Sequence, residues 1–183
     1  MPHYERIYIT GFMGSGKSTV TPRLARGLGY DSMDLDAEIS RFLGMSIPAI
    51  FDVLGESEFR ATESAKLTET ANAEKMVISL GGGSINREEN LAFCLENGYL
   101  VYLRASVSFL ADRLSVSLRN RPKLFSADGE MLEGAALEAR VEALLTERVA
   151  RYERAHLIVD IDDRAPSEIA RFIEQSIRGA RAD

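Results

Sequence analysis

The chain has 183 residues, 45% of them hydrophobic and 27% charged, a length that provides one domain with a substantial core and little more. The formal net charge of −6 argues against a nucleic-acid-binding surface, and no apolar run approaches the length of a membrane span. The single cysteine, Cys94, excludes an intramolecular disulfide framework, and the two histidines are too few to favour a zinc site. A reducing, cytoplasmic setting is therefore expected.

The first predicted element is a buried strand over residues 5–10, followed at once by Gly-Phe-Met-Gly-Ser-Gly-Lys-Ser over residues 11–18. That stretch fits the phosphate-binding pattern G-x-x-x-x-G-K-[ST], and a helical pattern continues from about Lys17 to Leu28. The glycines let the backbone turn several N–H groups toward phosphate oxygens, and the helix N-terminus adds its own donors. A glycine-rich turn without a ligand is the alternative, but the strand before it and the helix after it favour nucleotide binding.

The loop residues have distinct expected roles. Lys17 reaches the β- and γ-phosphates of the nucleotide, and the Ser18 hydroxyl holds Mg²⁺. The residues expected to contact the nucleotide phosphates are Gly14, Ser15, Gly16, Lys17, Ser18 and Thr19. This motif alone does not identify the acceptor of the phosphoryl group.

Two carboxylates lie at the end of the second predicted strand, residues 30–35. Asp34 and Asp36 are two residues apart, so in extended backbone they point to the same side. One could hold magnesium through water while the other accepts the proton of a hydroxyl group or orients that group. Alternatively, Asp36 caps a helix that begins at Ala37. The two residues alone do not decide between these interpretations.

Alternating helices and strands continue along the chain. Residues 115–134 break the pattern, and a segment of this length without clear periodicity is typical of a functional lid or a disordered insertion. A short helix is expected from Ser46, with Pro48 in its first turn, and further helices over residues 37–43, 56–72, 87–96, 106–114, 137–155 and 166–177. Further strands are expected over residues 76–80, 99–103 and 157–160. This order predicts a three-layer α/β domain with a five-stranded parallel sheet and ligands beyond the carboxyl ends of the strands.

Further motifs follow the phosphate loop. They are Asp34-x-Asp36, Gly-Glu-Ser-Glu-Phe-Arg-x-x-Glu over residues 55–63, Leu-Gly-Gly-Gly over 80–83, Arg121-Pro122 and Arg148-x-x-x-Tyr152. In this order the set closely resembles shikimate kinase over nearly the whole chain. The resemblance implies the P-loop NTP hydrolase fold in a nucleoside monophosphate kinase-like form. It also implies a single domain, residues 1–183, with substrate-binding helices over about 36–72 and a mobile lid over about 115–134.

The resemblance further implies transfer of the γ-phosphoryl group of ATP to the 3-hydroxyl of shikimate, within the route to chorismate and the aromatic amino acids. The catalytic residues would be Lys17, Asp36 and Arg121, with Arg121 brought in by the lid. Asp34 would join Ser18 in holding Mg²⁺. The residues that the resemblance assigns to shikimate are Asp36, Arg60, Gly81, Gly82, Gly83 and Arg148. Those that it assigns to ATP outside the loop are Arg121, Arg164 and Pro166.

The residue types suit these roles. Shikimate carries a carboxylate, and two forked guanidinium groups at Arg60 and Arg148 match it, although either arginine by itself could be an ordinary surface residue. The three glycines at 81–83 bring backbone N–H groups close to a substrate, but a plain strand-to-helix turn would also favour glycine.

The chain departs from the family pattern at two places in the lid and from a wider phosphate-loop pattern at a third place. Lys123 follows Arg121-Pro122, where the family usually continues with two leucines. The additional lid arginine that stacks on adenine in the family has no clear match, and Arg119 is the candidate replacement. Ser79 stands near the end of the third strand, where many phosphate-loop proteins place an aspartate that binds magnesium. The metal is therefore expected to depend more on the loop serine and on the carboxylate after the second strand.

Other phosphate-loop proteins are the alternatives. A GTPase needs a guanine-reading Asn-Lys-x-Asp stretch, which the sequence lacks, and the D-x-x-G match over residues 52–55 lies in a helix-to-turn stretch. A kinase of another small hydroxy acid, such as gluconate, would not require both Arg60 and Arg148 around a carboxylate. A nucleotide-binding sensor without catalysis would not require Asp36 and Arg121. The expected partners are ATP and shikimate, with no nucleic acid and no membrane, and the expected state is a monomer.

Overall fold

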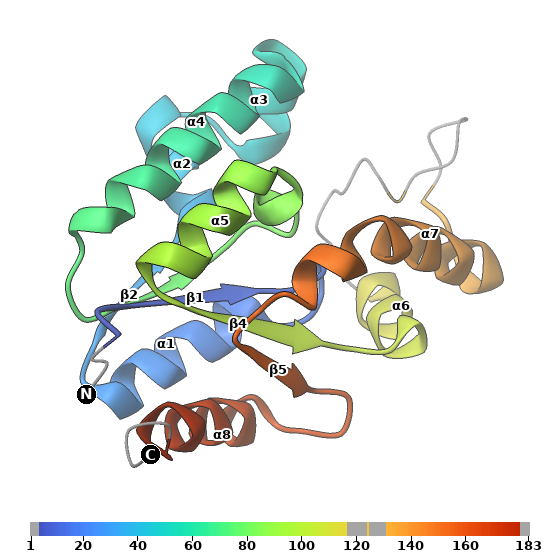
Figure 1. The fold of residues 1–183 in the computed structure, drawn as a ribbon. Helices are drawn as coiled ribbons and strands as arrows, with labels where there is room; N and C mark the ends of the chain where they lie inside the picture. Colours follow the sequence, from blue (N-terminus) through green and yellow to red (C-terminus); the bar gives the residue numbers. More distant parts are fainter. Residues whose placement is uncertain (1–3, 117–123, 125–130, 180–183) are drawn as a thin grey trace.

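A parallel sheet forms the centre of the molecule, of which the computed structural model describes residues 4–116, 124 and 131–179. The sheet has five strands in the order β2-β3-β1-β4-β5, all parallel (Figure 1). They are β1 Arg6–Thr10, β2 Asp31–Asp34, β3 Met76–Ser79, β4 Tyr99–Arg104 and β5 Leu157–Asp160. The predicted five-stranded α/β fold is confirmed.

The helices follow the predicted order. They are α1 Lys17–Leu28, α2 Leu35–Leu43, α3 Ile47–Val53, α4 Gly55–Glu69, α5 Glu88–Asn97, α6 Val107–Ser115, α7 Gly134–Tyr152 and α8 Pro166–Gly179. The predicted helix over 56–72 is divided into α4 and the 3-10 helix η1 Thr70–Asn72, and periodicity did not predict the second 3-10 helix, η2 Ser84–Asn86. Helix α7 begins and ends earlier than the predicted 137–155, and α1 continues through Pro22.

Helices cover both faces of the sheet because successive side chains of a strand point to opposite faces. In β1, Ile7 and Ile9 pack into a core with α1 and α8, whereas Tyr8 packs into a second core with α2, α4 and α5. All three side chains are fully buried. Figure 1 shows the corresponding layers, with α1 and α8 on one side of the sheet and α2, α4 and α5 on the other.

The start of α2 corrects one interpretation of the sequence. The helix begins at Leu35, and its N-cap is Asp34, whose Oδ1 accepts a hydrogen bond from the Ala37 N–H at 3.1 Å. The interpretation in which Asp36 caps a helix beginning at Ala37 is therefore wrong. The expectation of extended backbone through Asp36 is also wrong, because Asp36 lies in the first turn of α2. Asp34 takes the cap because it is the last extended residue, with φ −108° and ψ 117°, from which a side chain reaches the exposed helical N–H groups.

The phosphate loop lies where the strand order reverses. Strand β1 lies between β3 and β4, so the chain builds one half of the sheet before it returns to the other side of β1. Such a switch point at the carboxyl ends of parallel strands is where open α/β sheets bind ligands. The lid predicted over about 115–134, including Arg119 and Arg121, falls mostly outside the described residues.

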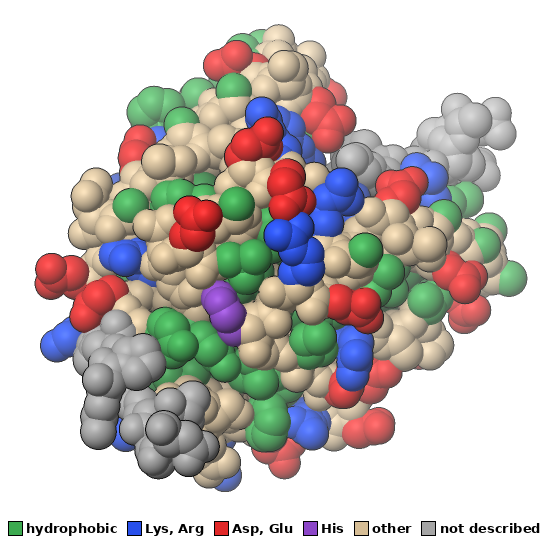
Figure 2. All heavy atoms as spheres, in the orientation of Figure 1, with side chains coloured by type: hydrophobic (Ala, Val, Ile, Leu, Met, Phe, Trp, Pro, Cys, Tyr) green, Lys and Arg blue, Asp and Glu red, His purple; other side chains and the backbone are tan. Residues whose placement is uncertain are grey.

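Charges of both signs are mixed on the surface. On the face shown in Figure 2, acidic and basic side chains lie interspersed between apolar ones. Among the helices of the described ranges, none combines the length and the apolar character that crossing a bilayer requires.

The turn between α5 and β4 yields a stability prediction. A Cβ atom at Gly98 would lie 2.5 Å from the Arg6 carbonyl oxygen and 2.8 Å from the Tyr8 ring, both in the adjacent β1. Gly98→Ala should therefore lower the free energy of unfolding by about 1–3 kcal/mol, since relief of these contacts requires a backbone shift between the two central strands. Urea unfolding measures this. The matched control is Gly179→Ala, because a Cβ there meets no described atom within 4 Å. Equal stability of the two variants would contradict the prediction.

Candidate active site

The phosphate loop joins β1 to α1 as predicted. Gly14 and Gly16 have φ values of +85° and +87°, which L side chains rarely adopt, so glycine is required at both positions. Lys17 begins α1, and its Nζ donates hydrogen bonds to the carbonyl oxygens of Gly11 and Phe12 at 2.8 and 3.1 Å. The lysine ammonium is thus held directly at the loop.

Ser18 and Asp34 meet beside the loop. The Ser18 hydroxyl donates a hydrogen bond to Asp34 Oδ2 at 3.0 Å, while Asp34 Oδ1 caps α2. An alcohol oxygen and a carboxylate oxygen therefore lie next to one another, and these are hard donors of the kind that magnesium prefers. Within the described ranges, no group of three or more His, Cys, Asp or Glu side chains could hold a metal ion. These two oxygens could therefore contribute to a metal site but do not complete one.

The Gly81–Gly83 turn after β3 brings together the side chains that the sequence assigned to the acceptor. A Cβ on the first glycine would lie 2.7 Å from Asp36 Oδ1, and one on the third glycine 3.0 Å from Arg60 Nη2. A Cβ on the second would lie 3.9 Å from Arg148 Nη1 and 3.4 Å from the backbone nitrogen of Met13 in the phosphate loop. Side chains from α2, α4 and α7 therefore converge on one turn next to the phosphate loop.

Asp36 lies in an environment that makes it a stronger base than an exposed aspartate. Burial, followed by the nearby charges of Glu63 and Asp34, raises the pKa of its carboxyl from 3.8 to about 6 against the opposing effect of Lys17 and Arg60. The carboxyl is therefore mostly ionised at neutral pH, yet it binds a proton more readily than an exposed aspartate. A base with these properties suits the removal of a hydroxyl proton.

The Arg60 guanidinium is fixed by α4. Its Nη1 donates to Glu63 Oε2 at 2.7 Å and its Nη2 to Glu56 Oε1 at 3.3 Å, while the group lies 5.0 Å from the centre of the Phe59 ring. Glu63 is fully buried, and its other oxygen accepts a hydrogen bond from the Ser84 hydroxyl at 2.5 Å. The buried carboxylate thus has a partner for each oxygen, so the ion pair holds Arg60 in one orientation.

Arg148, on α7, reaches the same turn from a different helix. It is only 4% exposed, its Nη1 donates to the Gly82 carbonyl oxygen at 3.0 Å, and its guanidinium lies 5.4 Å from the centre of the Phe12 ring. Its Nε is buried and has no hydrogen-bond partner among the described residues. A buried donor without a partner costs free energy, which sets Arg148 apart from an ordinary surface arginine.

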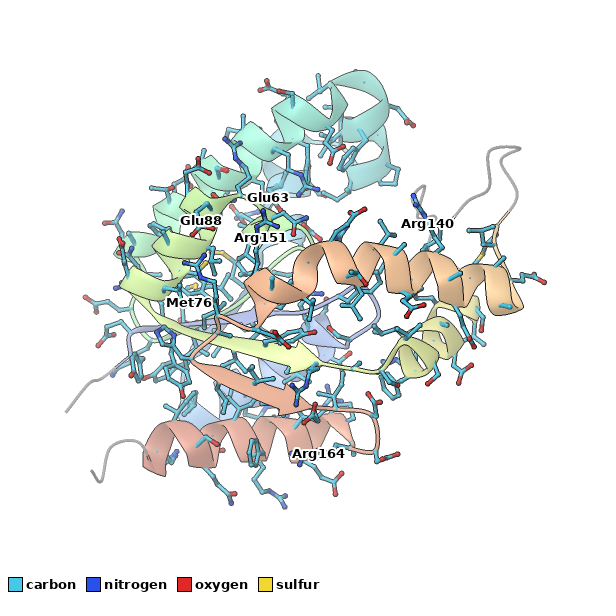
Figure 3. All side chains as sticks on the ribbon, turned by 45° about the vertical axis from the view of Figure 1, so that its right-hand side comes forward. Glu63, Met76, Glu88, Arg140, Arg151 and Arg164 are labelled. Atoms are coloured by element: carbon cyan, nitrogen blue, oxygen red, sulfur yellow. The ribbon has the colours of Figure 1, made fainter. Side chains whose placement is uncertain are left out.

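Two of the nucleotide residues predicted outside the loop, Arg164 and Pro166, do not join this cluster. Arg164 follows β5, its guanidinium lies 5.0 Å from the centre of the Phe172 ring, and Pro166 begins α8. Figure 3 shows Arg164 beside α8, on the other side of the sheet from Glu63. Arg121 lies outside the described residues.

Sequence reasoning missed another arginine at the phosphate loop. Arg113, in the last turn of α6, has its guanidinium nitrogens 3.6 and 3.8 Å from the position of a Cβ on Gly16, and the group lies 5.3 Å from the centre of the Phe109 ring. The available signal was topological, since α6 follows β4 and β4 pairs with β1. No signal in the sequence indicated that Glu63 anchors Arg60 and Ser84, because Ser84 is distant from Glu63 in the sequence and Arg60 precedes it on the same helix face.

The amino-acid sequence of this chain is similar to those of known proteins. The sequence model of the family described as shikimate kinase matches residues 13–178. The shikimate kinase of Chlorobium phaeobacteroides (strain BS1) is 39% identical over 184 residues, which cover 98% of this chain and 92% of that protein. The shikimate kinase of Salinibacter ruber is 40% identical over 173 residues, which cover 94% of this chain and 85% of that protein.

Solved structures give the same result. A shikimate kinase from Acinetobacter baumannii, solved in complex with shikimate, superposes with a TM-score of 0.88 at 32% identity, covering 99% of this chain and 97% of that one. A gluconokinase from Sinorhizobium meliloti 1021 covers 96% of each chain with a TM-score of 0.59 and 19% identity, which shows a shared fold alone. Because the family model spans most of the chain and relatives are about 40% identical over nearly its whole length, this chain belongs to the shikimate kinase family.

Proposed function

We propose that this chain transfers the γ-phosphoryl group of ATP to the 3-hydroxyl of shikimate, giving shikimate 3-phosphate and ADP. The observation that carries the proposal is the convergence of Asp36, Arg60 and Arg148 on the Gly81–Gly83 turn beside the phosphate loop. This places a base and two guanidinium groups next to a phosphate site, which is what a small carboxylic acid with a reactive hydroxyl requires. The product belongs to the route to chorismate and the aromatic amino acids.

The two arginines bind the shikimate carboxylate. Arg148 gives one donor to the Gly82 carbonyl and directs remaining guanidinium donors to a carboxylate oxygen. Arg60 is pre-oriented by Glu63, so little side-chain entropy is lost when the acid binds. Met13 of the phosphate loop lies against the same turn, which keeps the acceptor close to the γ-phosphate.

Asp36 accepts the proton of the 3-hydroxyl. The hydroxyl oxygen forms a bond to the γ-phosphorus, the bond from that phosphorus to the bridging oxygen breaks, and the electron pair leaves with ADP. Lys17 exchanges its contacts with the Gly11 and Phe12 carbonyls for phosphate oxygens and neutralises the charge that develops. Arg113 supports the phosphates from α6, and Arg121 is proposed as the lid cation.

Magnesium fits the oxygen pair of Ser18 and Asp34. Magnesium takes oxygen ligands and usually retains several waters, so a hydroxyl and a carboxylate supplemented by phosphate oxygens match its preference. When bound with ATP it neutralises charge on the β- and γ-phosphates. Arg164 and Pro166 are proposed to lie beside adenine. A monomer in the cytoplasm remains a prediction, and the single, buried cysteine supports only its reducing setting.

A coupled assay of ADP release tests the proposal. Purified protein with ATP and Mg²⁺ should turn over shikimate and leave gluconate unchanged. Turnover of gluconate alone would assign the chain to another hydroxy acid, and ATP binding without turnover of either compound would identify a nucleotide sensor.

The raised pKa of Asp36 predicts a pH profile. Because the protonated carboxyl cannot accept a proton, kcat/KM for shikimate should fall as the pH is lowered through about 6 rather than near 3.8. Glu63→Gln removes a negative charge that raises this pKa, so the midpoint should move to lower pH. Glu56→Gln is the control. Glu56 also accepts a hydrogen bond from Arg60, but its charge is not among the main ones that shift the pKa of Asp36, so the midpoint should stay in place. A midpoint unchanged by Glu63→Gln would contradict the assigned base.

The fork of Arg148 predicts an acceptor-specific defect. Arg148→Lys retains the charge but loses the planar donor pair, so the KM for shikimate should rise about tenfold or more while the KM for ATP stays within about twofold. Arg151→Lys is the matched control on the same helix, because within the described residues the Arg151 side chain donates only to the Glu147 carbonyl. Initial rates with each substrate varied give both constants. Equal increases in both for Arg148→Lys count against the role.

A further inference from the structure

The Gly82 carbonyl oxygen accepts two hydrogen bonds from α7. Arg148 Nη1 donates at 3.0 Å and the Tyr152 hydroxyl donates at 2.5 Å. The two donors are four residues apart, so they lie on one face of the helix, one turn from each other. Two donors occupy both lone pairs of a carbonyl oxygen, and the peptide at Gly82 is therefore fixed from the α7 side.

Tyr152 is itself held rigidly. Its side chain is fully buried, and its ring stacks on Tyr102 of β4 with 4.8 Å between ring centres and 27° between planes. Burial raises the pKa of the Tyr152 phenol, so the hydroxyl keeps its proton and serves as the donor. The hydroxyl position is thus set by the sheet rather than by the acceptor site.

The other side of Gly82 faces the phosphate loop. A Cβ there would lie 3.4 Å from the Met13 nitrogen and 3.7 Å from the Gly11 carbonyl oxygen, and Phe12 lies beneath the Arg148 guanidinium. Any rotation of the Gly82 peptide would therefore displace both the turn and the guanidinium that rests on it.

We propose that Tyr152 is a positioning residue for the acceptor, acting through Gly82 and Arg148. Its hydroxyl holds the carbonyl independently, so Arg148 can direct its remaining donors to a carboxylate without becoming the sole anchor of the turn. The inference rests on the proposed function, since it concerns the shikimate that Arg148 binds.

Tyr152→Phe tests the proposal because it removes the hydroxyl and keeps the ring stack. The KM for shikimate should rise about fivefold to tenfold, as expected for loss of one buried hydrogen bond that organises a binding group, while kcat and the KM for ATP stay within about twofold. Tyr102→Phe is the matched control, because it removes the hydroxyl of the stacked partner and leaves the Gly82 contacts intact. It should leave the KM for shikimate unchanged.

A double-mutant cycle separates positioning from a structural role. In the Arg148→Lys background, Tyr152→Phe should raise the KM for shikimate by less than it does in the parent chain, because both changes act through one contact. Thermal unfolding first defines a temperature at which every variant is folded, and calorimetric titration with shikimate at that temperature should repeat the pattern.

A lowered unfolding temperature with unchanged shikimate binding in Tyr152→Phe would overturn the proposal, as would a full, additive effect in the Arg148→Lys background. Failure of the parent chain to turn over shikimate would instead reject the proposed function, so the two failures are distinguishable.

Discussion

The close approach of the Gly81–Gly83 backbone to three charged side chains is the constraint on which the site depends. A side chain on the first glycine would collide with Asp36, and one on the third would press on Arg60. Since glycine has no Cβ, the carboxylate and the guanidinium groups can lie against the turn and therefore near one another. The same turn contacts the phosphate loop, so one short segment couples the geometry of the acceptor to that of the nucleotide.

Buried charge in this region is balanced rather than removed. Glu63 is fully buried, but Arg60 and Ser84 pair its two oxygens, so the cost of taking it out of water is offset by specific contacts. Its charge and the burial of Asp36 then keep the Asp36 pKa near neutrality. In a chain with a net charge of −6, the positive charge that reaches this region comes from individual side chains such as Lys17, Arg60 and Arg148.

Much of this architecture was predictable from the sequence. The glycine pattern before Lys17 and the apolar runs of the central strands specify the loop and sheet, because both depend on local geometry and strand periodicity. The start of α2 was predicted wrongly, since Asp34 and Asp36 are equally good capping residues in the sequence and only the backbone decides between them. Arg113 could not be assigned, because its position depends on how α6 packs against the loop.

A second group of contacts depends on long-range packing. The hydrogen bonds from Arg148 and Tyr152 to Gly82 span 66 and 70 residues, and no local pattern indicates that two donors share one carbonyl. The resemblance to the family identified Arg148 and Tyr152 as a spaced pair, but the physical reason for the spacing is a helical turn facing the glycines. Sequence motifs therefore pointed to Arg148 and Tyr152, whereas packing determined what each side chain contacts.

The most direct test of the account is a crystal structure of this chain with ADP and shikimate bound. The account predicts shikimate carboxylate oxygens within hydrogen-bond distance of both Arg60 and Arg148, with the 3-hydroxyl against Asp36. A shikimate molecule whose carboxylate contacts neither guanidinium, or whose 3-hydroxyl lies away from Asp36, would contradict it.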